Sequence, residues 1–140
     1  MAKKSVYVCV KRDLTHPISW ALREFEGKIA VRYFDTTKLL GVALSDTEEG
    51  VVVILDSIMA EESTLPFAAS VKAEKPFLKI LLIVSAGTSK EEIVKIIQSK
   101  VVSGVLIRPF TAEQVSDNIY KLCSFEKPAE VPWYMKTGLQ

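Results

Sequence analysis

A carboxylate stands at the end of one of the most apolar stretches of the chain. Residues 51–55 read VVVIL, and Asp56 follows them directly. A run this short and this apolar is typical of a strand that is buried on both faces of a parallel sheet. An acid where such a strand emerges can belong to a binding site, or it can cap the turn that follows.

Polar side chains also stand at the ends of three other apolar runs: Lys11, Arg12 and Asp13 after the first, Ser85 after the fourth and Arg108 after the fifth. If these runs are strands of one parallel sheet, their carboxyl ends share one edge. In open sheets of this kind, ligands bind beyond that edge, where the strand order reverses. The position of Asp56 therefore favours a binding site over a simple cap.

The elements that would position these residues follow from the alternation of apolar patterns. Short β-branched runs predict five strands, at residues 5–10, 29–34, 51–55, 80–84 and 105–107. Between and after them, apolar residues recur at helical spacing, in residues 18–25, 39–44, 63–75, 93–97 and 115–122. Strands that alternate with helices predict an α/β fold, a doubly wound five-stranded parallel sheet in the order 2-1-3-4-5.

Two helix starts carry a capping-box pattern, in which a hydroxyl residue precedes a Glu or Gln by three positions. Thr111 and Gln114 fit this pattern before the last helix. Before the fourth helix, either Thr88 with Glu91 or Ser89 with Glu92 fits it. These signals place the helix starts just beyond the predicted site edge.

Composition excludes several classes of function. The chain has 140 residues, which fits one domain, and 18 basic against 17 acidic side chains give a net charge of +1. A charge this small gives no general attraction to nucleic acid or to a membrane surface. No apolar run is long enough to span a bilayer, and Lys11 to Asp13 interrupt the first run too early for a signal peptide. We expect a cytoplasmic protein that neither inserts into a membrane nor binds nucleic acid through this domain.

The thiols and the imidazole do not suggest a metal centre. Cys9 falls in a predicted strand and Cys123 in a predicted helix, so we expect two buried thiols rather than a disulfide. Two cysteines and one histidine make a zinc site improbable. His16 precedes Pro17 at an expected helix start, where a surface or capping role is the simplest. Trp20 is expected to be core-facing or partly exposed, with packing as its simplest role.

Three segments together resemble landmarks of a known family. The segments VVVILDSIM, LLIVSAG and SGVLIRPFTAEQV are similar to those of response-regulator receiver domains, the CheY-like domains, over roughly residues 4–125. The family has an acceptor Asp at the end of strand 3, a Ser or Thr at the end of strand 4 and a Lys-Pro pair after strand 5. Here these positions hold Asp56, Ser85 and Arg108-Pro109. The resemblance implies the flavodoxin/CheY-like (βα)5 fold and a cis bond between Arg108 and Pro109.

The resemblance also implies a chemistry, the transfer of a phosphoryl group from a histidine kinase to Asp56. In the family, Mg²⁺ is held by two acids after strand 1, by the acceptor Asp and by a backbone carbonyl. A lysine, here Arg108, contacts the phosphoryl oxygens, and the hydroxyl of a residue such as Ser85 follows the phosphoryl group. An aromatic residue in strand 5 then rotates inward.

This sequence departs from that pattern at the metal site and at the aromatic position. The acidic pair falls on Val10 and Lys11, and the aromatic position is Val105. Asp13 is the nearest other carboxylate, and we expect it to reach the site only if the loop is rearranged. Mg²⁺ needs several oxygen ligands, so the ammonium of Lys11 is expected to replace the charge of the metal beside Asp56. A salt bridge between Arg108 and Asp56 is an equally good expectation.

Three functions remain open. The first is a signalling receiver-like module that acts by protein-protein interaction, without Mg²⁺-dependent phosphorylation, enzymatic activity or a cofactor. The second is a working phospho-receiver of a two-component phosphorelay, which accepts a phosphoryl group on Asp56 and holds Mg²⁺ with Asp56 and Asp13. The third, a flavodoxin-like enzyme or nucleotide binder, has little support because the glycines are scattered and form no phosphate-binding loop. In the first two cases the partner is a signalling protein such as a histidine kinase or an output domain.

Residues 1–125 are predicted to form the receiver-like domain, and residues 126–140 a C-terminal tail or the start of a linker. The tail contains Pro128, Pro132, Trp133 and Tyr134. Aromatic residues beside proline can dock in a groove of this domain or of a partner. The same segment can equally be the opening of a following domain, and the sequence leaves the oligomeric state open.

Overall fold

The computed structural model describes residues 3–47 and 51–126, and the predicted tail from residue 127 onward lies outside the described residues. A five-stranded sheet forms the centre, in the order β2-β1-β3-β6-β7 with every pair parallel. The strands are β1 (Lys4–Cys9), β2 (Ile29–Tyr33), β3 (Val51–Asp56), β6 (Lys79–Val84) and β7 (Gly104–Ile107). Because β6 and β7 are the fourth and fifth strands of this sheet, the predicted order 2-1-3-4-5 is confirmed.

The central strand β3 is buried along its whole length, from Val51 to Asp56. It pairs with β1 through Ser5 to Cys9 on one side and with β6 through Lys79 to Ile83 on the other. Each face of β3 therefore contacts a layer of helices, which explains why its sequence is continuously apolar instead of alternating.

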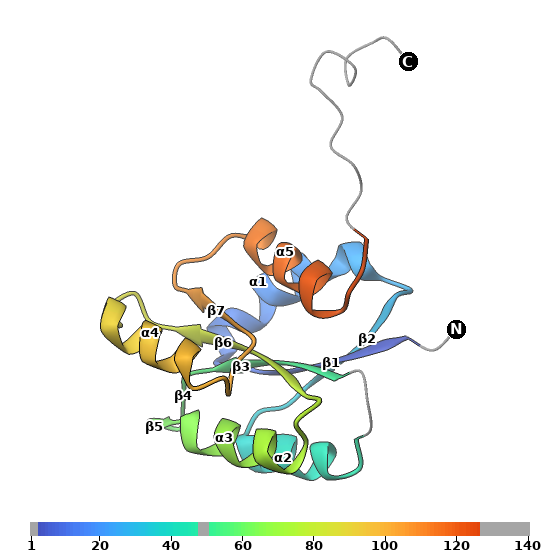
Figure 1. Ribbon diagram of the computed structural model, residues 1–140. Coiled ribbons are helices and arrows are strands. Elements are labelled where there is room, and N and C mark those ends of the chain that lie inside the picture. Colours follow the sequence, from blue (N-terminus) through green and yellow to red (C-terminus); the bar gives the residue numbers. More distant parts are fainter. Residues whose placement is uncertain (1–2, 48–50, 127–140) are drawn as a thin grey trace, which may run out of the picture.

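Five α-helices cover the two faces of the sheet. They are α1 (Arg12–Leu22), α2 (Thr37–Ser45), α3 (Leu65–Glu74), α4 (Lys90–Gln98) and α5 (Ala112–Leu122), and a 3-10 turn η1 (Arg23–Phe25) extends α1. Helices α1 and α5 pack on one face, whereas α2, α3 and α4 lie on the other (Figure 1). Two buried apolar clusters, one on each face, hold these layers together. No helix in the described part of the chain is long and apolar enough to cross a membrane.

Helix α1 begins earlier than its sequence suggested. Pro17 looked like a helix start, but the helix begins at Arg12 and Pro17 lies inside it. Proline lacks the N–H that would bond to the carbonyl four residues earlier, so α1 lacks the hydrogen bond that a residue with an N–H at this position would make to Asp13. The earlier start places Asp13 in the first turn of the helix, at the site edge of the sheet.

Trp20 does not join the core, which is the second of the two positions that its spacing allowed. Its side chain is 59% exposed, and the guanidinium of Arg23 lies 4.9 Å from its ring centroid. The core-facing residues of α1 are Leu14, Ile18, Ala21 and Leu22. His16 is exposed, as a surface histidine should be.

A small antiparallel hairpin, which the sequence did not reveal, follows Asp56. Its strands are β4 (Ile58–Met59) and β5 (Glu62–Ser63). The two residues between them, Ala60 and Glu61, have φ angles of 51° and 63°. Left-handed backbone costs a non-glycine residue about 1 kcal/mol or more. The sequence therefore did not predict this hairpin, because tight hairpin turns usually contain Gly or Asn at these positions.

Side chains form hydrogen bonds with the free backbone groups at several helix ends. Thr111 and Gln114 form the predicted capping box of α5, and Ser89 caps α4 by accepting the N–H of Glu92 at 3.1 Å. Lysines satisfy carbonyl groups at two C-terminal ends. Lys75 donates to the carbonyl of Ser45, the last residue of α2, at 3.3 Å and to that of Thr47 just beyond it at 2.6 Å. Lys79 donates to the carbonyl of Leu122 at 2.9 Å. A cation is favourable at this end of a helix because the dipole is negative there.

Phe25 is expected to be a main support of the layer formed by α1 and α5. It is 0% exposed, and its ring lies 4.8 Å from that of Tyr120 and 5.9 Å from that of Phe125. Replacing Phe25 by Ala should lower the free energy of unfolding by about 3–5 kcal/mol, because the substitution leaves a cavity. The exposed Trp20→Ala is the matched control and should cost less than about 1 kcal/mol. Urea unfolding followed by circular dichroism measures both, and similar costs would contradict this account.

Candidate functional site

Asp56 ends β3 at the carboxyl edge of the sheet, and its residue exposure is only 2%. The N-terminal end of α1 lies beside it, since the backbone N–H of Lys11, the N-cap residue of α1, donates to Asp56 Oδ2 at 3.4 Å. The N–H of Ile58 donates to Oδ1 at 3.3 Å. A helix N-terminus and backbone amides both favour a negative charge at this position.

The counter-charge of Asp56 comes from Arg108, which follows β7. Arg108 Nη2 lies 2.8 Å from Asp56 Oδ2, and Nη1 lies 3.1 Å from Asp13 Oδ2. The guanidinium thus bridges a nearly buried carboxylate and an exposed one, whose side chains are 4% and 65% exposed. The predicted salt bridge between Arg108 and Asp56 is present, and it connects β3, β7 and the first turn of α1.

Lys11 does not have the role expected for it. Its ammonium forms no ion pair with Asp56 in the described structure, and the two residues meet through the backbone amide instead. As the N-cap of α1, Lys11 carries its side chain on the exposed surface. The positive charge beside Asp56 comes from Arg108, whose longer side chain reaches across the edge from β7.

Asp13 also differs from its expected behaviour. It reaches the site without any rearranged loop, because α1 starts at Arg12 and presents the carboxylate in its first turn. Its contact is with Arg108 rather than with Asp56. Ser85 lies at the end of β6, as expected, but it is exposed and its hydroxyl pairs with that of Thr88 at 3.1 Å.

The loop after Asp56 is held by the backbone of that residue. The hydroxyl of Thr64, which is 2% exposed, donates to the carbonyl of Asp56 at 2.6 Å. The N–H of Ser57 donates to the carbonyl of Ile83 at 2.8 Å. These bonds fix the backbone where the chain leaves β3. They therefore hold the Asp56 carboxylate in place at the edge of the sheet.

The donor set fits Mg²⁺ poorly. A magnesium ion needs octahedral oxygen ligation and is usually held by one or two carboxylates together with phosphate oxygens. Asp56 and Asp13 are the carboxylates on hand, and the guanidinium of Arg108 lies between them. Within the described residues there is no cluster of three His, Cys, Asp or Glu side chains that could hold a metal. A dication would first have to displace Arg108.

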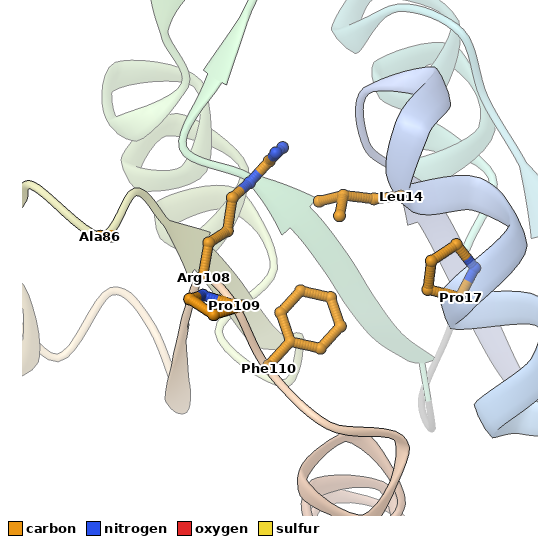
Figure 2. A pocket seen from close by; sticks show the side chains of 6 residues that line it. All are labelled: Leu14, Pro17, Ala86, Arg108, Pro109 and Phe110. Atoms are coloured by element: carbon orange, nitrogen blue, oxygen red, sulfur yellow. The ribbon is translucent and has the colours of Figure 1, made fainter.

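An apolar pocket opens next to Arg108. Its volume is about 500 Å³, and it is lined by Leu14, Pro17, Ala86, Arg108, Pro109 and Phe110. Figure 2 shows Leu14 and Pro17 on α1 facing Pro109 and Phe110, which follow β7. The bond between Arg108 and Pro109 is cis, as expected. Sequence reasoning missed this pocket, although the apolar Pro109 and Phe110 directly after a strand end were a usable signal.

The thiols are buried and unpaired, as predicted. Cys9 and Cys123 are 0% and 3% exposed, and neither forms a disulfide. Burial, and to a lesser extent the charges of Asp56 and Asp35, raise the pKa of the Cys9 thiol to about 11. Burial also raises the pKa of Cys123. Both groups therefore stay protonated near neutral pH and are poor nucleophiles.

Comparisons with known proteins agree on the fold. No family model matches the sequence, and no curated protein matches it. Among solved structures, a response regulator from Thermotoga maritima superimposes with a TM-score of 0.72 at 19% identity, covering 88% of this chain and 99% of that one. The chemotaxis response regulator CheY4 of Vibrio cholerae gives 0.67 at 18% identity, covering 87% and 99%.

A third similar structure is part of a longer chain. NtrX from Brucella abortus matches with a TM-score of 0.72 at 18% identity, covering 89% of this chain and only 27% of NtrX. At sequence identities this low, structural similarity establishes the fold alone. The chain has the fold of response-regulator receiver domains, as its three sequence segments suggested.

The two ion pairs of Arg108 should differ in their contribution to stability. We expect Arg108→Met to lower the free energy of unfolding by about 2–4 kcal/mol, because it leaves the buried charge of Asp56 without a partner. Asp13→Asn removes only the exposed pair and should cost less than about 1 kcal/mol. In a double-mutant cycle, Asp56→Asn combined with Arg108→Met should cost less than the sum of the single changes. Additive costs in urea unfolding would contradict a coupled pair.

The raised pKa of Cys9 predicts a pH effect on stability. The folded protein keeps the thiol proton up to about pH 11, whereas the unfolded chain releases it near the ordinary thiol pKa of 9.0. The contribution of the protonated Cys9 thiol to the free energy of unfolding is complete below pH 9. That free energy should fall as the pH rises from 9 through 11. Cys9→Ala should show a shallower fall over the same window, since all other groups are unchanged. Equal slopes for the two proteins would refute the prediction.

Proposed function

We propose that this protein is a receiver-like signalling module that acts by binding partner proteins and does not need Mg²⁺-dependent phosphorylation of Asp56. One observation carries the proposal. The guanidinium of Arg108 bridges Asp56 at 2.8 Å and Asp13 at 3.1 Å, and so occupies the place between the two carboxylates.

Transfer of a phosphoryl group needs positive charge to neutralise the oxygens of the transferred group, and it needs an accessible acceptor. Asp56 has a side chain that is 4% exposed, and its counter-charge is already a fixed cation. The charge of Asp56 is thus already neutralised by Arg108 without a metal ion. We infer that a module with such a site signals through contacts of its surface with partner proteins.

A working phospho-receiver is the second candidate. Its support is that Asp56, Ser85 and Arg108 all stand at the same edge of the sheet, each at the end of its own strand. A guanidinium binds phosphoryl oxygens well through paired N–H donors. In that case Arg108 would move from the carboxylate to the phosphoryl group, and Asp56 and Asp13 would hold Mg²⁺.

Under the first candidate the domain carries no catalytic activity, and under either candidate its partners are signalling proteins such as a histidine kinase or an output domain. The match to one part of the longer chain of NtrX supports the view that a domain of this fold works together with others. The net charge of +1 supports a domain that does not bind nucleic acid. The two unpaired thiols support a cytoplasmic location.

The experiment combines a small phosphodonor with Mg²⁺ and follows the mass of the intact protein. We expect no phosphoryl adduct on the natural protein and no saturable Mg²⁺ binding in a titration calorimeter. The double variant Lys11→Asp with Arg108→Lys should gain measurable Mg²⁺ affinity, because it adds an oxygen ligand where the residue 11 backbone meets Asp56 and removes the bridging guanidinium. Asp56→Asn in that background is the matched control and should lose the gain.

Rapid formation of an adduct that Asp56→Asn abolishes would overturn the proposal and establish the second candidate. Saturable Mg²⁺ binding by the natural protein would also overturn the proposal, and it would favour the second candidate. Asp13→Asn then tells whether the second carboxylate contributes a ligand.

A further inference from the structure

The apolar pocket beside Arg108 has no occupant among the described residues. We propose that it receives the C-terminal segment of this same chain, residues 131–134 with the sequence Val-Pro-Trp-Tyr. The inference concerns a contact within the chain and does not depend on whether Asp56 accepts a phosphoryl group.

The chemistry of the pocket selects an aromatic and apolar guest. Five of its six lining residues are Leu, Pro, Ala or Phe, and its volume of about 500 Å³ is in the usual range for a bound group. Arg108 lies at its edge and has more N–H donors than its two carboxylate contacts use. A guest that combines an aromatic face with backbone carbonyls can stack beside this guanidinium and accept from it.

The end of the described chain lies within reach. Helix α5 has 11 residues and runs from the pocket side of the sheet to the far side, a length of about 16 Å. Beyond it, Phe125 is fixed against Phe25, and its N–H donates to the carbonyl of Tyr120 at 2.9 Å. The stretch from Glu126 to Trp133 spans roughly 23 Å when extended, which is enough to return along α5 to Leu14 and Phe110.

A second hollow lies nearer to Phe125, between α1 and the edge strand β2. It is lined in part by charged and polar side chains, among them Lys3, Ser19, Arg23 and Glu26. Burial of Trp133 there would desolvate charges without pairing them, which is unfavourable. The pocket between α1 and the segment after β7 offers the better chemical match.

The test uses the full chain and the fluorescence of Trp133. The sequence has two tryptophans, so Trp20→Phe leaves Trp133 as the only one. We expect its emission to be shifted to shorter wavelength, and quenching by acrylamide to be several-fold weaker than in the free peptide of residues 127–140. Adding Phe110→Ser should restore the emission and quenching of the free peptide. Tyr33→Ser, in the hollow beside β2, is the matched control and should change neither.

Three outcomes would overturn the proposal. Trp133 that behaves as in the free peptide shows that the tail is not docked. A response to Tyr33→Ser but not to Phe110→Ser places it in the other hollow. Protection that is lost on dilution shows that the guest comes from a second copy of the chain. Circular dichroism and urea unfolding of each variant show that the domain remains folded, so a loss of protection is not mistaken for unfolding.

Discussion

A carboxylate removed from water must be given a positive partner or enough hydrogen bonds, and this constraint organises the carboxyl edge of the sheet. Asp56 is almost fully buried, so its charge is sustained by Arg108 at 2.8 Å and by backbone N–H groups of Lys11 and Ile58. These three partners come from the segment after β7, the start of α1 and the loop after β3. The geometry of that edge is thus tied to one ionised group.

The strand order makes this arrangement possible. Because β1 and β6 flank β3, the segments after β1 and β6 lie on either side of Asp56, and β7 follows next to β6. An arginine after β7 must reach past one strand to touch Asp56, which a long guanidinium side chain does. The same reach brings it to Asp13 on α1. A shorter basic residue at position 108 would contact one carboxylate at most.

Much of the fold could be predicted because the strands are buried on both sides and are therefore continuously apolar. The strand order, the capping box at Thr111 and the polar edge containing Asp56 followed from pattern alone. The start of α1 did not, because Pro17 imitates a helix start, and the hairpin after Asp56 did not, because Ala60 and Glu61 adopt left-handed backbone that their identities do not favour. The choice between Lys11 and Arg108 depends on side-chain direction, which spacing along the sequence does not encode.

The bridge made by Arg108 has a mechanical consequence. One wall of the apolar pocket is α1, through Leu14 and Pro17, and the other is the segment that follows β7, through Pro109 and Phe110 (Figure 2). The guanidinium joins these walls, because Arg108 belongs to the segment after β7 and forms an ion pair with Asp13 of α1. Its side chain therefore links the two walls across the opening. Because the Asp13 carboxylate is 65% exposed, salt screens this contact, so the link between the walls weakens as the ionic strength rises.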